Sequence, residues 1–175
     1  MSHHSKGSRQ APIGAPLRHT RIFTEREHDP YRARRKPAAP TVCPSCHLVF
    51  SAGHWQQARW VWGLPPEHAR EQLCPACRRI REHLPAGYVR LAGRFISDHP
   101  EEVLNTVKRC EARAKAEHPL QRIIAMEPNA GDVHITTTDI HLARRIGEAL
   151  HRAYRGRLQF HYEAGQPLLR VTWTR

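Results

Sequence analysis

Two Cys-x-x-Cys pairs constrain the fold of this 175-residue chain more than any other feature of its sequence. The pairs are Cys43 with Cys46 and Cys74 with Cys77, and both have the form Cys-Pro-small-Cys. Two residues between thiolates allow a tight turn to direct both sulfur atoms at one metal, and the proline fixes φ in that turn. Two such turns supply the four soft ligands of a tetrahedral site. We therefore predict one structural Zn²⁺ bound by Cys43, Cys46, Cys74 and Cys77.

Other cysteine chemistry fits the pattern less well. A redox dithiol is normally a single pair near a βαβ unit, and a catalytic zinc keeps one ligand position open. An iron–sulfur cluster uses the same four ligands, so metal identity stays open. The insert between the two pairs holds Trp55, Trp60 and Trp62, of which at least one is expected to pack in a small core, with base stacking as the alternative for exposed ones. The fifth cysteine, Cys110, falls on the inward stripe of a predicted helix, where we expect a buried apolar residue.

Charge indicates the class of partner. The 28 Lys and Arg outnumber the 16 Asp and Glu, giving a formal net charge of +12. Such a balance favours a polyanion, most simply nucleic acid. A basic membrane-surface protein needs an amphipathic basic helix with large apolar residues, and none is evident. No apolar run approaches the ~18 residues of a membrane span, and no secretory signal is evident. We expect a cytoplasmic protein with no membrane partner and no small-molecule substrate.

Three regions follow one another along the chain. Residues 1–40 contain nine Lys or Arg, three acids and five prolines, which predicts a disordered basic tail. This tail is either a solubilising leader or an arm that folds along a phosphate backbone. Residues 41–84 carry the cysteine pairs and are predicted to form a zinc ribbon with four cysteine ligands. Residues 85–175 show periodic apolar segments and are predicted to form an α+β domain.

The α+β domain has the predicted order β-α-β-β-α-β-β. This is a ferredoxin-like, split βαβ fold with one extra strand, in which two helices cover one face of the sheet. Asp98 is the expected N-cap of the first helix, and Thr138 or Asp139 begins the second, which ends at Gly156. The strands are predicted at 88–92, 122–126, 133–137, 158–162 and 168–173, and the first helix runs to about residue 117.

Clusters of basic residues are the candidate nucleic-acid contacts. One lies in the tail, a second follows the metal site, and a third is expected on one exposed face of the second helix. Ordinary surface solvation is the alternative, and Glu148 interrupts the third cluster. The candidates are Arg32, Arg34, Arg35, Lys36, Arg70, Arg78, Arg79, Arg81, Arg145, Arg152 and Arg155.

No set of residues in the sequence indicates catalysis. The best candidates are Asp139 and His141, but Asp139 is more simply a helix cap and His141 is expected to be solvated. A Gly-rich phosphate loop, a nucleophile elbow and a His-Glu-x-x-His helix are all missing from the sequence. We therefore predict a non-catalytic protein with no catalytic residues.

The cysteine pairs, the Trp-containing insert and the Thr-rich segment entering an Ala-Arg helix at 135–147 resemble one known family. It is the large-ribosomal-subunit export adaptor family of archaea and eukaryotes, and the chain looks most like its short bacterial relatives. The resemblance covers about residues 41–175, and only the four cysteines carry over residue by residue. It implies a zinc-stabilised protein that docks on ribosomal RNA, in subunit maturation or as a stress factor on idle ribosomes. A protein–protein adaptor or DNA-associated regulator is the alternative, and a nucleic-acid-processing enzyme is the second.

Overall fold

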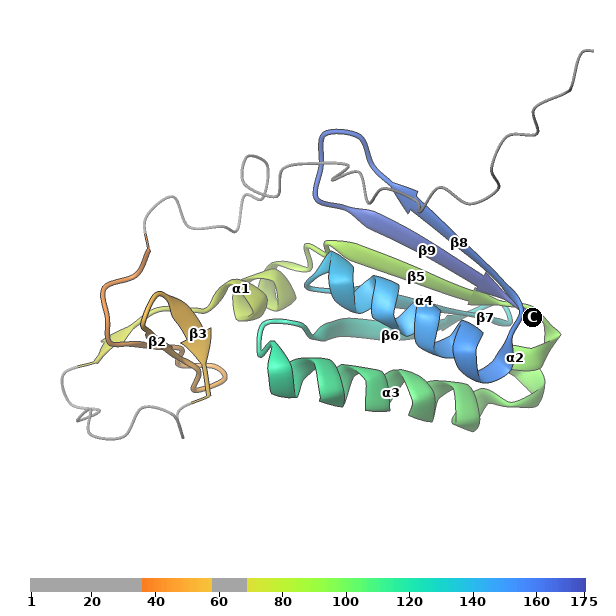
Figure 1. Cartoon of the computed structure of the whole chain (residues 1–175), viewed down its shortest axis with the longest axis horizontal. Helices are drawn as coiled ribbons and strands as arrows, with labels where there is room; N and C mark the ends of the chain where they lie inside the picture. The colour runs from red at the N-terminus through yellow and green to blue at the C-terminus, as the bar shows by residue number, and fades with distance from the viewer. Residues whose placement is uncertain (1–35, 58–68) are drawn as a thin grey trace, which may run out of the picture.

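The computed structural model describes residues 36–57 and 69–175. Residues 1–35 of the predicted basic tail lie outside this part, and with them the contacts assigned to Arg32, Arg34 and Arg35. The predictions for Trp60 and Trp62 also fall outside the described residues. Within the described part, the protein is a mixed α and β structure with four helices and two mixed sheets. A small group of elements around the cysteines lies at one end of the molecule, beside a larger sheet with its helices (Figure 1).

The elements around the cysteines, residues 41–57 and 69–83, are called the cysteine module below. A four-stranded sheet in the order β3-β2-β1-β4 is followed by helix α1. Strand β1 pairs antiparallel with β2 and parallel with β4, and β2 and β3 form a hairpin. The elements are β1 (Thr41–Val42), β2 (Val49–Ser51), β3 (His54–Gln56), β4 (Arg70–Glu71) and α1 (Pro75–Glu82).

The larger part, residues 85–175, is called the α+β domain. Its elements follow the predicted order, with one further short helix, α2, after the first strand. Its five-stranded sheet has the order β6-β7-β5-β9-β8. The elements are β5 (Gly87–Ala92), α2 (Arg94–Asp98), α3 (Pro100–Glu117), β6 (Ile123–Asn129), β7 (Asp132–Thr137), α4 (Ile140–Tyr154), β8 (Arg157–Tyr162) and β9 (Leu169–Thr174).

The added strand lies inside the sheet. Strand β7 lies between β5 and β6 and is antiparallel to both, as in a split βαβ unit. The last strand, β9, is inserted between β5 and β8 and runs parallel to β5. Hydrophobicity explains the order, because β9 buries Leu169, Val171 and Trp173 completely or nearly so, whereas β8 is mostly exposed. The more apolar strand of the hairpin takes the interior position and leaves the polar one at the edge.

Helix starts show one correct and one wrong prediction. Asp139 is the N-cap of α4, and its side chain accepts hydrogen bonds from the backbone N–H groups of His141 and Leu142. Asp98 does not cap α3, because it belongs to the last turn of α2 and pairs with Arg94 at 3.4 Å. The N-cap of α3 is His99, which makes no side-chain capping bond.

Strand β6 is longer than the sequence indicated. It continues through Pro128 to Asn129, so the turn is confined to Ala130 and Gly131. Proline lacks the N–H that an interior strand needs for pairing on both sides. It is tolerated here because β6 is an edge strand, paired only with β7.

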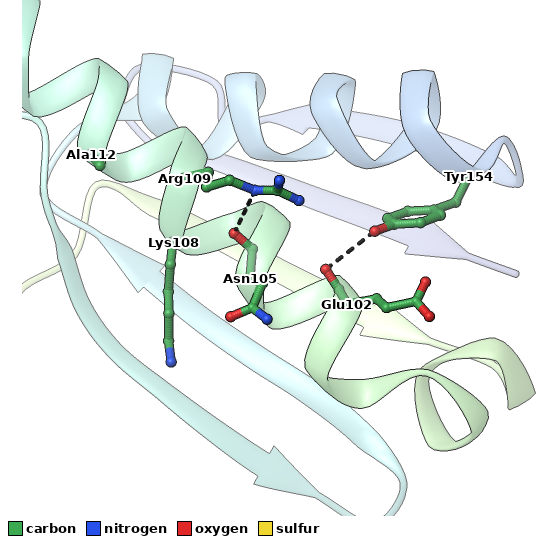
Figure 2. Close-up of a pocket in the computed structure, with 6 residues that line it drawn as sticks. All are labelled: Glu102, Asn105, Lys108, Arg109, Ala112 and Tyr154. Carbon is green, nitrogen blue, oxygen red and sulfur yellow. Dashed lines mark hydrogen bonds between the residues drawn. The ribbon is translucent and has the colours of Figure 1, made fainter.

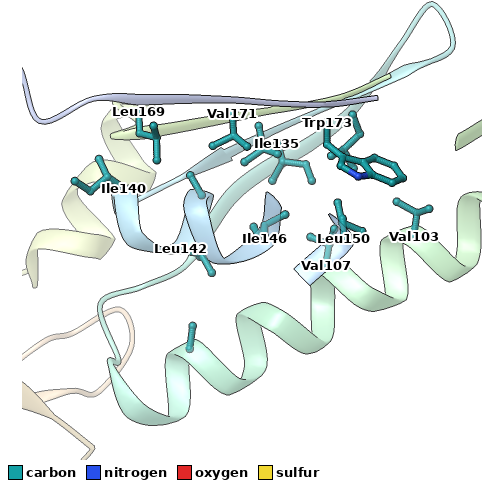
Figure 3. Close-up of a cluster of buried hydrophobic side chains, with 14 of the residues drawn as sticks. Val103, Val107, Ile135, Ile140, Leu142, Ile146, Leu150, Leu169, Val171 and Trp173 are labelled. Carbon is teal, nitrogen blue, oxygen red and sulfur yellow. The ribbon is translucent and has the colours of Figure 1, made fainter. Parts of the chain in front are cut away.

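The core of the α+β domain fills the space between the sheet and helices α3 and α4. Side chains of β5, β7 and β9 point towards the helices, which contribute Val103 and Val107 from α3 and Leu142, Ile146 and Leu150 from α4 (Figure 3). The Trp173 indole N–H donates a 2.7 Å hydrogen bond to the carbonyl oxygen of Arg155, so its polar atom is satisfied. The opposite face of the sheet carries no helix of the described chain (Figure 1).

Candidate metal centre

The four cysteines of the two pairs meet in one cluster. Cys43 and Cys46 lie in and beside the turn between β1 and β2, Cys74 is the N-cap of α1, and Cys77 is in the first turn of that helix. Their four sulfur atoms all lie within 4.8 Å of one another. All but Cys46, which is half-buried, are shielded from solvent. The predicted pairing of the two motifs is therefore present in the structure.

This arrangement fits one tetrahedral metal ion. With Zn–S bonds of about 2.3 Å, the sulfur atoms of a regular tetrahedron are about 3.8 Å apart. The sulfur atoms of Cys46 and Cys74, on different motifs, are 3.7 Å apart. All-thiolate donor sets suit soft or borderline ions such as Zn²⁺. The four residues can therefore hold one metal ion, and four protein ligands leave no open position for a substrate.

The second pair differs from the predicted tight turn. Cys74 and Cys77 lie at the start of an eight-residue helix, with Pro75 in its first turn. The N–H of Cys77 donates to the sulfur of Cys74 at 3.4 Å, and the N–H of Cys74 donates to the sulfur of Cys43 at the same distance. Unpaired N–H groups at a helix start favour negative charge. The start of the helix thus replaces the predicted turn, and its N–H groups also stabilise thiolates.

The cysteine pKa values reflect a site built for a cation. Burial opposes ionisation of Cys43, but N–H groups of Cys74, Cys46 and Ser45 outweigh it and lower the pKa of Cys43 to about 7. Burial raises the pKa of Cys74, and the negative charges of the other three sulfurs raise it further. Burial also raises the pKa of Cys77. Four adjacent thiolates repel one another, and a bound cation removes that repulsion.

Apolar side chains pack around the cysteines. Phe50 and Trp55 are in edge-to-face contact, with ring centroids 5.6 Å apart. Trp55 is only 8% exposed, which supports the packing role over base stacking. Leu120, from the loop between α3 and β6, also packs against this cluster. The α+β domain thus contributes to the surroundings of the cysteine site.

Arg122 is a residue of the site that the sequence analysis missed. It is 8% exposed, and its Nη1 donates to the sulfur of Cys77 at 3.4 Å. Burial lowers the pKa of Arg122, but a hydrogen bond to the sulfur of Cys46 and the negative charges of the neighbouring cysteines outweigh burial and raise it. The only sequence signal was a charged residue at the start of an apolar strand, and strand ends are ordinarily polar.

The basic candidates near the metal site divide into buried and exposed residues. Arg79 is 6% exposed and donates to the carbonyl oxygen of Leu84 at 2.9 Å, closing the end of α1. Its guanidinium faces the backbone of the protein rather than solvent, and its assignment as a nucleic-acid contact stays a prediction. Arg70 and Arg81 are exposed, and Arg78 is half-buried. Lys36 is exposed at the start of the described chain.

The third basic cluster lies on and beside α4. Arg145 and Arg152 belong to the helix, whereas Arg155 follows its last residue with a φ of 62°. Arg145 pairs with Glu117 of α3 at 3.3 Å, and Arg144 pairs with Glu148 at 2.7 Å. Glu148 therefore does form an ion pair within this helix, as expected, but its partner is Arg144 rather than a residue of the predicted cluster.

Cavities lined by described residues also lie outside the cysteine cluster, including two large ones. The first, of about 690 Å³, lies against α3 and is lined by Glu102, Arg109 and Tyr154 among others (Figure 2). The Tyr154 hydroxyl donates to the carbonyl oxygen of Glu102 at 3.2 Å, so these two polar groups of the cavity wall bond to each other. The second, of about 630 Å³, lies between the cysteine module and the α+β domain, beside Trp55 and Leu120.

Comparison of the chain with protein-family models, with curated proteins and with solved structures gives no match. Among the described residues, no helix is both long and apolar enough to cross a membrane.

Proposed function

We propose that this chain is a non-catalytic, zinc-stabilised RNA-binding protein whose α3–α4 layer contacts the phosphate backbone. The observation that carries the proposal is a set of exposed cations on these helices without ionic partners. Lys108, Arg113, Lys115 and Arg152 are exposed and form no ion pair with another residue that the structure describes. Cations that are not already neutralised are the ones that can release counterions from a nucleic acid.

Helices α3 and α4 both carry arginines close enough to affect the thiol of Cys110, which is half-buried on α3. These are Arg145, Arg113 and Arg152, and the carboxylate of Glu148 lies in the same region. Arg145 is paired with Glu117, so Arg113 and Arg152 are the two that form no ion pair with a described residue. Guanidinium binds phosphate in a bidentate manner, which suits a closely spaced set for a phosphate backbone.

The uncovered face of the sheet is the competing surface, since open sheets often bind RNA. Its central cations are already paired. Arg90 lies 2.6 Å from Asp132, and Arg170 lies 3.0 Å from Glu163 and over the ring of Tyr88. Binding RNA there would first break these contacts, so the helical layer is the better candidate.

The ribosomal partner is proposed on the resemblance of the cysteine pairs and of residues 135–147 to the export adaptor family. The same resemblance supports a role in subunit maturation or on idle ribosomes under stress, and a cytoplasmic location is proposed together with this partner. The order of elements and the position of β7 between β5 and β6 support a ferredoxin-like assignment for the α+β domain. The net charge of +12 supports a polyanionic partner such as ribosomal RNA.

Matched charge reversals test the RNA surface. The R113E/R152E double variant and the R90E/R170E double variant change the net charge equally, but on opposite faces of the α+β domain. Fluorescence anisotropy with labelled single-stranded and duplex RNA is measured over a range of salt concentrations. We expect R113E/R152E to weaken binding at least about tenfold and to reduce the salt slope by roughly 2, with R90E/R170E within about twofold of wild type.

The opposite ranking of the two variants would move the binding site to the sheet face. Absence of salt-dependent RNA binding by the wild-type protein would refute the function itself, and a clear preference for duplex DNA would favour a regulator. The ribosomal assignment has its own test, which is sedimentation of lysate through a sucrose gradient at low salt. A protein that stays at the top of the gradient is not ribosome-associated.

A further inference from the structure

We propose that Arg122 is an outer-sphere residue of the metal centre that couples metal occupancy to attachment of the cysteine module to the α+β domain. This inference rests on the proposed metal site but not on RNA binding. Arg122 belongs to the α+β domain by sequence, in the link between α3 and β6, whereas Cys77 belongs to the cysteine module. Their contact joins two parts that have separate hydrophobic clusters.

The charge of the loaded site explains the buried guanidinium. Four thiolates around a divalent ion carry a net charge of −2. Arg122 is 8% exposed, and its Nη1 reaches the sulfur of Cys77 while its Nε donates to the carbonyl oxygen of Pro119 at 2.9 Å. A buried charge is tolerated only when it is paired and hydrogen-bonded. The metal–thiolate cluster is the anion that pairs with Arg122.

The backbone around Arg122 is fixed from the other side by Thr138. The N–H of Arg122 donates to the Thr138 hydroxyl oxygen at 2.9 Å, and that hydroxyl donates to the carbonyl oxygen of Leu120 at 2.7 Å. The N–H of Thr138 donates to the carbonyl oxygen of Arg122, also at 2.9 Å. Thr138 is 6% exposed and directly precedes Asp139, the N-cap of α4. The Cys77–Arg122 and Arg122–Thr138 hydrogen bonds therefore connect the sulfur of Cys77 with the start of α4.

Leu120 reinforces the connection with an apolar contact. It packs against the cluster that contains the cysteines, two residues before Arg122 in the same loop. One loop of the α+β domain thus offers the cysteine module an apolar contact and a charged one. Without the metal, nothing holds the four sulfur atoms together beside the buried guanidinium, and Leu120 loses its apolar contact as the cysteine module unfolds. The loop is therefore expected to loosen when the metal leaves.

Metal affinity is the first readout. Outer-sphere partners of metal ligands typically contribute 10- to 100-fold to affinity. Competition with a chromogenic chelator should show zinc bound about 10- to 100-fold more weakly by R122M than by wild type. R122K, which keeps the charge but lacks the planar fork, should fall in between. R157M removes an exposed arginine from the edge strand β8 and should match wild type.

Hydrogen exchange of residues 118–124 is the second readout. In the wild-type protein, removal of the metal should increase exchange of these amides. In R122M the difference between the loaded and metal-free forms should be smaller, because only the apolar contact of Leu120 is lost and no buried charge loses its partner. Cobalt substitution adds a spectroscopic signature, since loss of an N–H···S bond shifts the sulfur-to-cobalt charge-transfer bands.

The outcomes separate the two proposals. If the wild-type chain binds no metal, the proposed metal site fails and this inference fails with it. If metal binds and R122M and R122K match wild type in affinity and exchange, only the coupling through Arg122 is overturned. Tryptophan fluorescence and circular dichroism show whether R122M folds. If it does not, R122K alone decides the test. Metal affinity and hydrogen exchange of R122K equal to those of wild type would then refute the proposal.

Discussion

The sulfur atoms of Cys46 and Cys74 lie 3.7 Å apart although 28 positions separate them in the sequence. Chain closure over that length has an entropic cost that two thiols do not offset by themselves. Both residues carry free thiols and form no disulfide, and two further sulfur atoms lie within 4.8 Å. The four residues can hold one metal ion, and such an ion would supply the missing free energy, because it binds the folded state and not the unfolded chain.

The first prediction concerns stoichiometry. We expect one metal ion per chain after dialysis, and C74S should weaken binding by more than about 100-fold, beyond the usual effect of an outer-sphere change. Elemental analysis and cobalt titration measure both quantities. C110S is the matched control, since Cys110 lies outside the cluster, and it should bind one ion like wild type. Cobalt–thiolate charge-transfer bands of wild-type intensity in C74S would contradict the four-ligand site.

The second prediction concerns metal removal. A chelator should unfold the cysteine module and leave the α+β domain folded, because the module has only a small apolar cluster, in which three of the seven buried residues are cysteines. Domains below about 40 residues usually need a metal or disulfide for stability. Hydrogen exchange should show lost protection in residues 41–57 and retained protection around Trp173. Persistent protection of both regions in the chelator would mean that the metal is not structural.

Local patterns predicted most of the α+β domain. Asp139 followed by apolar residues at helical spacing identified α4, and alternation identified the strands, because these signals arise from neighbours in sequence. Helix α2 was missed, and its presence moved Asp98 from a cap to a helix end. Five-residue helices carry too little periodicity to be recognised. The interior position of β9 depends on competition between two strands, which no single segment reveals.

The metal site likewise combines residues that local sequence predicts with residues that only distant contacts bring into place. Spacing alone identified Cys43, Cys46, Cys74 and Cys77, because two-residue spacing is a local requirement of metal binding. Arg122 could not be identified, since its contact with Cys77 spans 45 positions. The burial of Arg79 was missed for a related reason, because arginine is usually exposed and its hydrogen bond to Leu84 depends on how the end of α1 closes.

Helix capping supplies the third prediction. D139A should lower the free energy of unfolding by about 1 kcal/mol, because two backbone N–H groups at the start of α4 lose their acceptor. D98A removes the same carboxylate from a pair with a largely exposed Arg94, and such pairs contribute about 0–1 kcal/mol. Urea unfolding followed by tryptophan fluorescence compares the two variants. Equal destabilisation would contradict the capping assignment.

Close packing of α4 on the sheet supplies the fourth prediction. A Cβ atom at Gly147 would lie 2.7 Å from Cγ1 of Val171 and 2.9 Å from Cδ1 of Leu158, below van der Waals contact. G147A should therefore destabilise the α+β domain by about 1–3 kcal/mol, although alanine favours helix. A153S, at an exposed position of the same helix, should stay within about 0.5 kcal/mol of wild type in the same urea experiment. A stabilised G147A would show that α4 and β9 are less closely packed.

The reactivity of Cys110 supplies the last prediction. Burial raises the pKa of Cys110 above the ordinary value of 9.0, and the nearby Arg145, Arg113 and Arg152 reduce this effect without cancelling it. Only the thiolate reacts, so the folded, metal-loaded protein should be alkylated more slowly at pH 7 than the same chain in urea. Its rate should rise about tenfold per pH unit and level off at a higher pH than in urea.

Mass spectrometry after timed iodoacetamide treatment between pH 7 and 10 follows Cys110 separately from the metal-binding cysteines. The comparison with urea holds the sequence constant and changes only the surroundings of the thiol. Half-maximal reactivity at the same or a lower pH in the folded protein would show that the charges of α3 and α4 outweigh burial. That result would place the guanidinium groups closer to Cys110 than the structure does.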